Sequence, residues 1–131
     1  MKAIILAAGR SSRLYPLTLE TPKGLLDVGG QKPLLRLVGQ LEKAGVDDIV
    51  VAVGHKKEKI QEALGGRVRY HEFPEYETKN YLHTLWSARH ELDSECLILY
   101  ADLMFDDEVL KKMIESPHHV SLAIDSGEVR P

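Results

Sequence analysis

Residues 3–18 of this chain read Ala3-Ile4-Ile5-Leu6-Ala7-Ala8-Gly9-Arg10-Ser11-Ser12-Arg13-Leu14-Tyr15-Pro16-Leu17-Thr18, and Thr21-Pro22-Lys23 follows shortly after them. The opening apolar run includes two isoleucines and is soon followed by glycine, which predicts a strand buried on both faces. The loop after it carries three cations, Arg10, Arg13 and Lys23, opposed there only by Glu20. Small residues let a ligand approach backbone N–H groups, and cations match phosphate oxygens. We therefore predict that this loop binds a nucleoside triphosphate.

The alternative for such a loop is an ordinary surface segment whose Arg and Lys side chains are only solvated. Its position favours binding, because it leaves the carboxyl end of a buried strand, where open α/β sheets hold their ligands. The loop is neither a Walker loop nor a dinucleotide fingerprint, since no glycine occurs between Gly9 and Gly24.

Composition limits the class of protein. The chain has 131 residues, 44% of them hydrophobic, which predicts one domain over residues 1–131 with its own core. Its net charge is −3. The slight acidity argues against nucleic acid as a partner. Cys96 is the one cysteine and suits a reducing compartment. No leader peptide or long apolar run is present in the sequence, so we expect a cytoplasmic protein with no membrane partner.

The rest of the chain alternates between predicted strands and helices. Strands are expected at residues 49–53, 68–71, 96–100 and 120–124, and helices at 33–45, after 55 up to 64, at 80–92 and from 106 to 114. This alternation predicts an α/β fold, a Rossmann-like doubly wound and mainly parallel sheet with helices on both faces. The last strand, residues 120–124, is apolar on both faces, and the few residues after it are too short for a helix that would cover it.

The opening stretch resembles a known family signature. The pattern Leu6-Ala7-Ala8-Gly9-x-x-x-Arg13-Leu14-x-Pro16-Leu17-Thr18, followed by Pro22-Lys23-x-Leu25-Leu26-x-Val28, is similar to that of nucleotidyltransferases that make NDP-sugars and CDP-alcohols. One position departs from the family, because Ser11 stands where a second glycine is usual. On this resemblance we predict the nucleotide-binding residues to be Leu6, Ala7, Ala8, Gly9, Arg10, Ser11, Ser12, Arg13, Lys23, Asn80 and Thr84.

The resemblance also implies a chemistry and the residues that perform it. The family's lysine at the position of Lys23 binds the triphosphate, and its aspartate at the position of Asp102 holds Mg²⁺. Here Ala101 replaces the glycine that usually precedes this aspartate. The alternative role for Asp102 is to cap a helix, which Asp106 or Asp107 can do instead. We predict Arg13, Lys23 and Asp102 as catalytic residues and Mg²⁺ as the cofactor.

The segment from Asn80 to Ala88 favours one subfamily. It lacks the Gln-Gly-Thr-Ala-like pattern of many sugar-phosphate enzymes, whereas Asn80 followed by Thr84 and Leu85 is similar to cytidylyltransferases that act on phosphocholine or phosphonates. Asn80 and Thr84 lie one helical turn apart and could hydrogen-bond the nucleotide, or Asn80 could only cap the helix. We expect CTP and a phosphorylated small acceptor, with a sugar 1-phosphate and UTP or dTTP as the alternative.

The family's catalytic domain continues well beyond the length of this chain. The resemblance therefore covers only the first part of that domain, and the fold is expected to be incomplete at the carboxyl end. The family holds its metal with a second aspartate from a later strand, which has no counterpart here. We expect a poor catalyst that self-associates through its uncovered last strand, and a non-catalytic nucleotide-binding or assembly module is a third interpretation.

Overall fold

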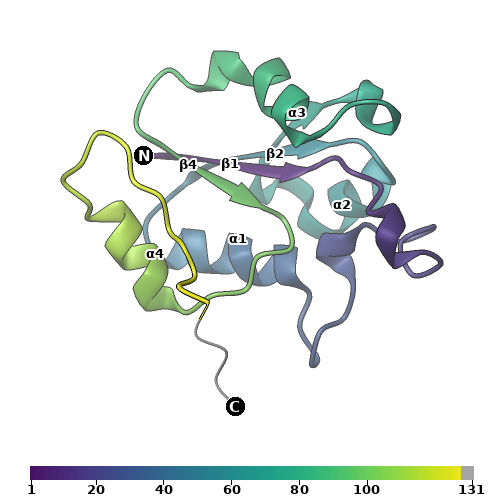
Figure 1. Cartoon of the computed structure of the whole chain (residues 1–131), viewed down its shortest axis with the longest axis horizontal. Coiled ribbons are helices and arrows are strands. Elements are labelled where there is room, and N and C mark those ends of the chain that lie inside the picture. Colours follow the sequence, from purple (N-terminus) through teal and green to yellow (C-terminus); the bar gives the residue numbers. More distant parts are fainter. Residues whose placement is uncertain (128–131) are drawn as a thin grey trace.

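The computed structural model describes residues 1–127, which form a four-stranded parallel sheet covered by helices (Figure 1). The strands are β1 (Lys2–Ala7), β2 (Asp48–Val53), β3 (Arg69–Glu72) and β4 (Cys96–Tyr100), in the spatial order β3-β2-β1-β4. The helices are α1 (Pro33–Lys43), α2 (Lys57–Leu64), α3 (Tyr81–Ser87) and α4 (Asp107–Ile114). The predicted α/β fold with a parallel sheet is confirmed.

Strand β1 lies inside the sheet, between β2 and β4. Its register places Ile4 beside Val50 of β2 and beside Ile98 of β4. Residues on both of its faces are buried, which agrees with the prediction from its continuous apolar run. Because all four strands run in parallel, their carboxyl ends meet at one edge, and the loop that follows β1 begins in the middle of that edge.

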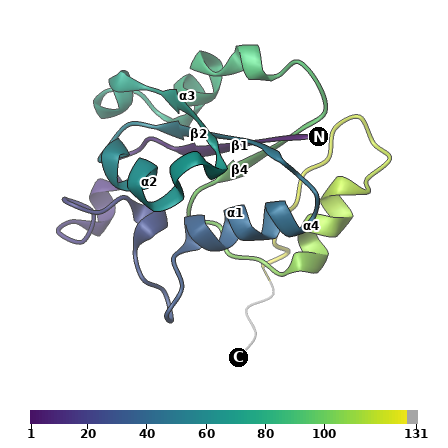
Figure 2. The ribbon, with the colours of Figure 1, turned by 180° about the vertical axis from the view of Figure 1, so that it is seen from behind.

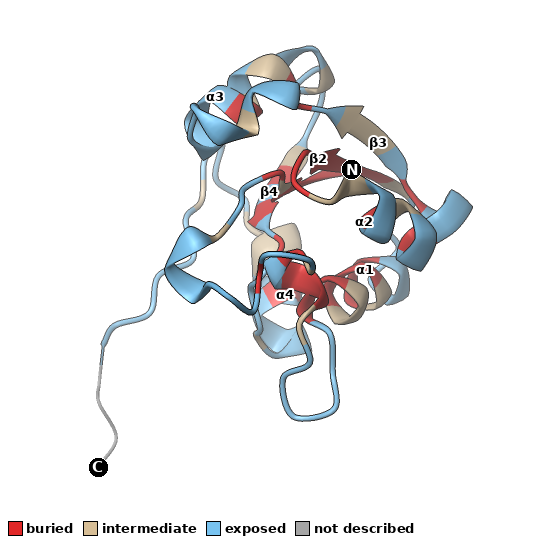
Figure 3. Cartoon of the chain, turned by 90° about the vertical axis from the view of Figure 1, so that its right-hand side faces the viewer, coloured by how far each residue is buried: buried red, intermediate tan, exposed pale blue. Residues whose placement is uncertain are grey.

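Three helices cover one face of the sheet, while α3 alone lies on the other (Figure 1 and Figure 2). The main core lies under α1, α2 and α4 and includes Ile5, Leu37, Val51, Ile60 and Leu110. The second core is small and is formed by Ile4, Leu6 and Ala52, with Leu85 of α3 packed against them. In Figure 3 β2 is mostly buried, whereas β3 is not and α3 is mostly exposed. The sheet is thus doubly wound, with unequal cover on its two faces.

Two predicted elements differ from the structure. The helix expected over residues 80–92 ends at Ser87, and a 3₁₀ turn follows over Arg89–Glu91. Ala88 leaves the helical conformation, with φ −91° and ψ 10°, and this turns Leu92 out to solvent. The spacing of apolar residues that suggested one long helix therefore continues across a break in the backbone.

The fifth strand predicted at residues 120–124 is wrong, because this segment pairs with no strand within residues 1–127. Val120, Leu122 and Ile124 are each about four-fifths exposed or more, at 88%, 82% and 79%. A strand is stabilised by the backbone of its neighbour, so an apolar sequence alone does not form one.

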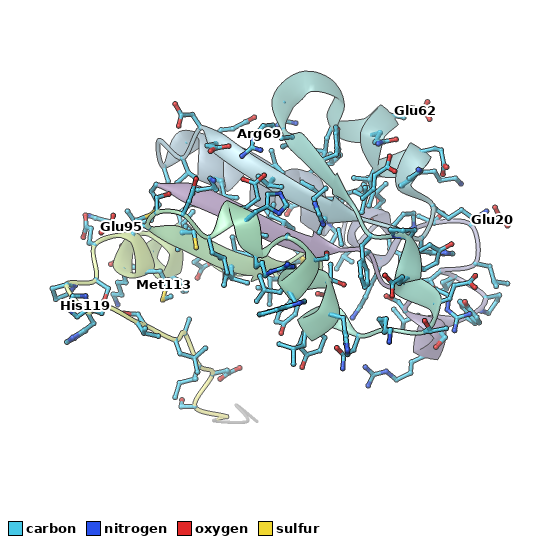
Figure 4. All side chains as sticks on the ribbon, turned by 90° about the horizontal axis from the view of Figure 1, so that it is seen from above. Glu20, Glu62, Arg69, Glu95, Met113 and His119 are labelled. Carbon is cyan, nitrogen blue, oxygen red and sulfur yellow. The ribbon has the colours of Figure 1, made fainter. Side chains whose placement is uncertain are left out.

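A network of ion pairs lies at the amino ends of the strands. The Lys2 ammonium donates to the carboxylates of Glu91 at 2.9 Å and Asp93 at 2.8 Å. Arg69 donates to both oxygens of Glu91 at 2.8 and 2.9 Å, and to Asp48. In Figure 4, Glu95, whose carbonyl accepts from Lys2 N–H, lies at the opposite end of the molecule from Glu20. The network therefore lies far from the loop after β1.

Among the described residues, the helices are too short to cross a membrane.

Candidate functional site

The loop after β1 lies at the carboxyl edge of the sheet, as predicted. It begins at Ala8, which is buried, and then turns outward so that Gly9, Arg10 and Arg13 are exposed. A short 3₁₀ helix spans Ser12–Leu14. The exposed backbone and the two guanidinium groups thus face solvent at the edge of the sheet where parallel α/β folds bind ligands.

Ser11 gives this loop its shape. Its backbone is left-handed, with φ 52° and ψ 47°, at the position where the resembling family has a glycine. The Ser11 carbonyl accepts from Leu14 N–H at 2.9 Å and from the Thr18 hydroxyl at 2.8 Å. The glycine is thus replaced without loss of the turn, and the serine adopts a conformation that costs an L-residue about 1–2 kcal/mol.

Ser11→Gly is therefore expected to stabilise the chain by about 1 kcal/mol, since glycine adopts the left-handed conformation without this cost and keeps the same carbonyl. Ser12→Gly is the matched control. Ser12 lies in the 3₁₀ helix, where glycine only adds freedom to the unfolded chain, so this variant should lose stability. Urea unfolding of the three proteins measures both effects. A lower stability for Ser11→Gly would contradict the argument.

Lys23 is brought to the site by a tight contact behind it. Pro22 precedes a short 3₁₀ helix over Lys23–Leu25, and Gly24 is the middle residue of this helix. A Cβ atom on Gly24 would lie 2.9 Å from the Ala101 carbonyl oxygen and 3.0 Å from Leu34 Cβ. The lysine segment is thus packed directly on the residue that follows β4, at a distance that only a glycine allows.

Lys23 and Asp102 form an ion pair, in which Nζ lies 2.5 Å from Oδ2. Asp102 comes from the end of β4 and Lys23 from the loop that began at β1, two neighbouring strands in the sheet. Both side chains are partly exposed, at 43% and 36%. Ion pairs of this exposure contribute only about 0–1 kcal/mol, so the two charges remain available to a ligand. The structure therefore brings two of the three predicted catalytic side chains into contact.

Arg10, Arg13 and Glu20 are the other charged residues of the loop. Arg10 donates weakly to the Glu77 carbonyl at 3.4 Å, and Arg13 is exposed. Glu20, the one acid in the loop, is paired with Lys56 at 3.0 Å, and this hydrogen bond lowers the pKa of its carboxyl. The charge of Glu20 is therefore balanced by Lys56, so it does not cancel the charge of the arginines.

Asn80 caps α3. Its Oδ1 accepts from Leu82 N–H at 3.1 Å and from His83 N–H at 3.3 Å, so the cap itself is present. Thr84 is buried, and its hydroxyl donates to the Asn80 carbonyl. The contact of these two residues with a nucleotide stays a prediction.

Within residues 1–127, no three His, Cys, Asp or Glu side chains converge on a point where they could hold a metal ion. Asp102 is the carboxylate beside the cationic loop and pairs with Lys23. At this site Asp102 can supply one carboxylate to an ion.

The predicted site residues do not include His55, which contacts the loop at both ends. Its backbone N–H donates to the Ala8 carbonyl at 2.9 Å, and its side-chain Nε2 lies 2.6 Å from the Thr18 carbonyl. The available signal was its position in the sequence, because Gly54-His55 directly follows a buried strand next to β1.

The chain is similar to known proteins over most or all of its length. The model of the MobA-like NTP transferase domain matches residues 3–130. The chain is 33% identical over all its length to the CMP-5'-(3-aminopropyl)phosphonate synthase of Streptomyces rubellomurinus, of which it covers 22%. It is also 33% identical, over 88% of its length, to the UTP–glucose-1-phosphate uridylyltransferase AglF of Haloferax volcanii, of which it covers 50%.

A solved structure shows the same arrangement of elements. The CTP:phosphocholine cytidylyltransferase of Streptococcus pneumoniae superimposes with a TM-score of 0.72 at 33% identity, covering 82% of this chain and 49% of that one. The chain thus spans half the length, or less, of these relatives. Both the family match and the fold agree with the resemblance in the opening stretch, and the chain belongs to the MobA-like NTP transferase domain family.

Proposed function

We propose that this chain forms the nucleotide-binding part of a nucleotidyltransferase, which transfers a nucleotidyl group from an NTP to a phosphorylated small acceptor and releases pyrophosphate. The observation that carries the proposal is the Lys23–Asp102 pair beside the loop after β1. A cation and a carboxylate together at the carboxyl edge of a parallel sheet suit a triphosphate and its counter-ion.

The reaction requires little covalent chemistry from the protein. An oxygen of the acceptor's phosphate or phosphonate forms a bond to the α-phosphorus, and the bond from that phosphorus to the pyrophosphate oxygen breaks in line with it. Arg13 and Lys23 would stabilise the negative charge on the phosphate oxygens, and the loop backbone would orient them. No side chain has to accept a proton from an acceptor that is already an anion.

Mg²⁺ fits the donor set at this site. The ion is commonly held by one or two carboxylates, together with substrate phosphates and waters. Asp102 supplies one partly exposed carboxylate, which is sufficient for an ion that arrives with the triphosphate. When bound, the ion would neutralise phosphate charge, and Asp102 would hold it.

CTP with phosphocholine or a phosphonate is the preferred substrate pair. Two similar proteins support it by name, a CMP-aminopropylphosphonate synthase and a CTP:phosphocholine cytidylyltransferase. The uridylyltransferase AglF supports the alternative, UTP with a sugar 1-phosphate.

The free Cys96 thiol suits the cytoplasm as the location.

A pyrophosphate-release assay tests the proposal. CTP, UTP and dTTP are each offered with phosphocholine, 2-aminoethylphosphonate and glucose 1-phosphate, with and without Mg²⁺. We expect CTP with one of the first two acceptors to react fastest, and only with Mg²⁺. Asp102→Asn should abolish the signal. A faster reaction of UTP or dTTP with glucose 1-phosphate would favour the alternative substrates.

A second candidate is a nucleotide-binding module without turnover. The observation that favours it is that, within residues 1–127, no three His, Cys, Asp or Glu side chains converge to hold a metal ion, because a loosely held α-phosphate can lose ~10²-fold in rate. The two functions separate when pyrophosphate release and calorimetric binding of CTP are measured on the same sample. Binding without release in every acceptor mixture would identify the module.

We also propose self-association through β4, whose outer edge has no neighbouring strand in the described sheet. Ile98 and Tyr100 are exposed there, at 49% and 42%, and β4 is an edge strand of the described sheet. Light scattering should give a mass that rises with concentration, because exposed apolar strand edges pair readily. Ile98→Lys should lower that mass, whereas Val28→Lys, at an equally exposed position in a turn, should not. A constant single-chain mass would contradict the proposal.

A further inference from the structure

The turn after β2 contacts the loop after β1 at both of its ends. The His55 backbone N–H donates to the carbonyl of Ala8, where the loop begins. Its Nε2 lies 2.6 Å from the carbonyl of Thr18, where the loop returns to the core. A carbonyl only accepts, so Nε2 carries the proton and donates it. His55 is only 8% exposed, and one residue thus bridges the two ends of the segment that contains Arg10 and Arg13.

Gly54 makes this close approach possible. A Cβ atom at this position would lie 2.8 Å from the Ala8 carbonyl oxygen and 2.9 Å from the Phe73 carbonyl oxygen. It would also lie 2.7 Å from a ring carbon of Tyr76. The turn is therefore held between the loop after β1 and the segment after β3, and a side chain here would push His55 away from Ala8.

Thr18 carries the contact into the loop. Thr18 is fully buried, and its hydroxyl donates to the Ser11 carbonyl at 2.8 Å. Ser11 is the left-handed residue that shapes the turn before Arg13. His55 holds the Thr18 backbone, and the Thr18 side chain holds Ser11. The conformation of the exposed loop thus depends on a buried imidazole.

We infer that His55 is the positioning residue of the nucleotide loop, which fixes both ends of the loop so that its backbone N–H groups are ordered before the ligand binds. This rests on the proposed function for the loop as a nucleotide site. A loop that is already ordered pays less conformational entropy on binding, so the loss of the anchor reduces affinity. A buried carbonyl left without its donor adds to the cost.

The test compares four variants by two measurements, with the melting temperature as a check of overall stability. Calorimetry gives the affinity for CTP with Mg²⁺, and amide hydrogen exchange gives the protection of residues 9–18 without any ligand. His55→Ala removes the donor, and His55→Gln restores an N–H at a similar reach. Thr18→Val removes the hydroxyl and keeps the carbonyl. Val46→Ala is the control, since this buried residue lies before β2, at the other end of the strand from His55.

We expect His55→Ala to weaken CTP binding roughly tenfold and to increase exchange in residues 9–18 by a similar factor. His55→Gln should recover most of both, and Thr18→Val should raise exchange mainly around Ser11. Val46→Ala should lower the melting temperature while leaving loop exchange and affinity as in the wild type. This pattern separates a positioning role from a general loss of stability.

Wild-type loop exchange in His55→Ala would overturn the inference, and so would the same loop exchange in Val46→Ala. If His55→Ala does not fold, His55→Gln and Thr18→Val decide, and unchanged exchange around Ser11 in Thr18→Val overturns it. If the wild type binds no nucleotide, the proposed function fails, and the exchange experiment still decides the role of His55.

Discussion

Lys23→Ala is expected to weaken the binding of an NTP with Mg²⁺ by roughly one to two orders of magnitude, which corresponds to about 1.5–3 kcal/mol for a charge-assisted contact. The substitution also removes the ion-pair partner of Asp102 and leaves that carboxylate in place to hold the metal. Isothermal titration calorimetry with CTP measures the change directly.

Two controls separate this effect from a general one. Lys23→Arg keeps the charge and should retain most of the affinity. Lys112→Ala removes a lysine from α4, away from the loop, and should bind as the wild type does. Equal affinity of Lys23→Ala and the wild type would show that Lys23 does not contact the phosphates.

Glu91→Gln is expected to reduce the free energy of unfolding by about 2 kcal/mol at neutral pH, because it breaks charge-assisted hydrogen bonds from both Lys2 and Arg69. The Glu91 side chain is only 12% exposed, so little water replaces these partners. Lys2 is also largely buried and would keep the carboxylates of Asp93 at 2.8 Å and Asp48 at 4.0 Å. Urea unfolding monitored by circular dichroism measures the loss.

The effect should depend on pH in a defined direction. Arg69 and Lys2 lower the pKa of Glu91 to about 2 from its ordinary value of 4.5. A carboxyl group whose pKa is lower in the folded state stabilises the fold fully above about pH 5 and loses this contribution as the pH falls towards its folded pKa. The difference between the wild type and Glu91→Gln should therefore shrink from about pH 7 to about pH 3. Glu95→Gln, at an exposed position, should show no such difference.

The sequence was sufficient for the parts of the fold that follow from local patterns. The apolar runs that became β1, β2 and β4 have no polar alternation, and such runs form parallel strands between helices, although β4 is buried on one face only. Parallel strands also share a carboxyl edge, so the loop after β1 and Asp102 after β4 could be predicted at one site. Their contact through Lys23 follows from this topology.

The features that the sequence did not reveal depend on partners distant along the chain. Residues 120–124 have the composition of a strand, but pairing requires a neighbouring backbone that composition does not report. Leu92 continues the apolar spacing of α3, yet the backbone turns at Ala88. The bond from His55 to Thr18 joins two loops, and no periodicity marks it.

The contact between Lys23 and Asp102 has a consequence for the selection of ligands. An anion that arrives alone must compete with Asp102 for the lysine, and a divalent cation that arrives alone must compete with the lysine for Asp102. Each would leave an unmatched charge behind. A ligand that carries both signs of charge replaces the two partners at once and leaves neither unpaired. The resting site would thus favour a triphosphate already complexed to its metal over simple salts, by no more than about 1 kcal/mol.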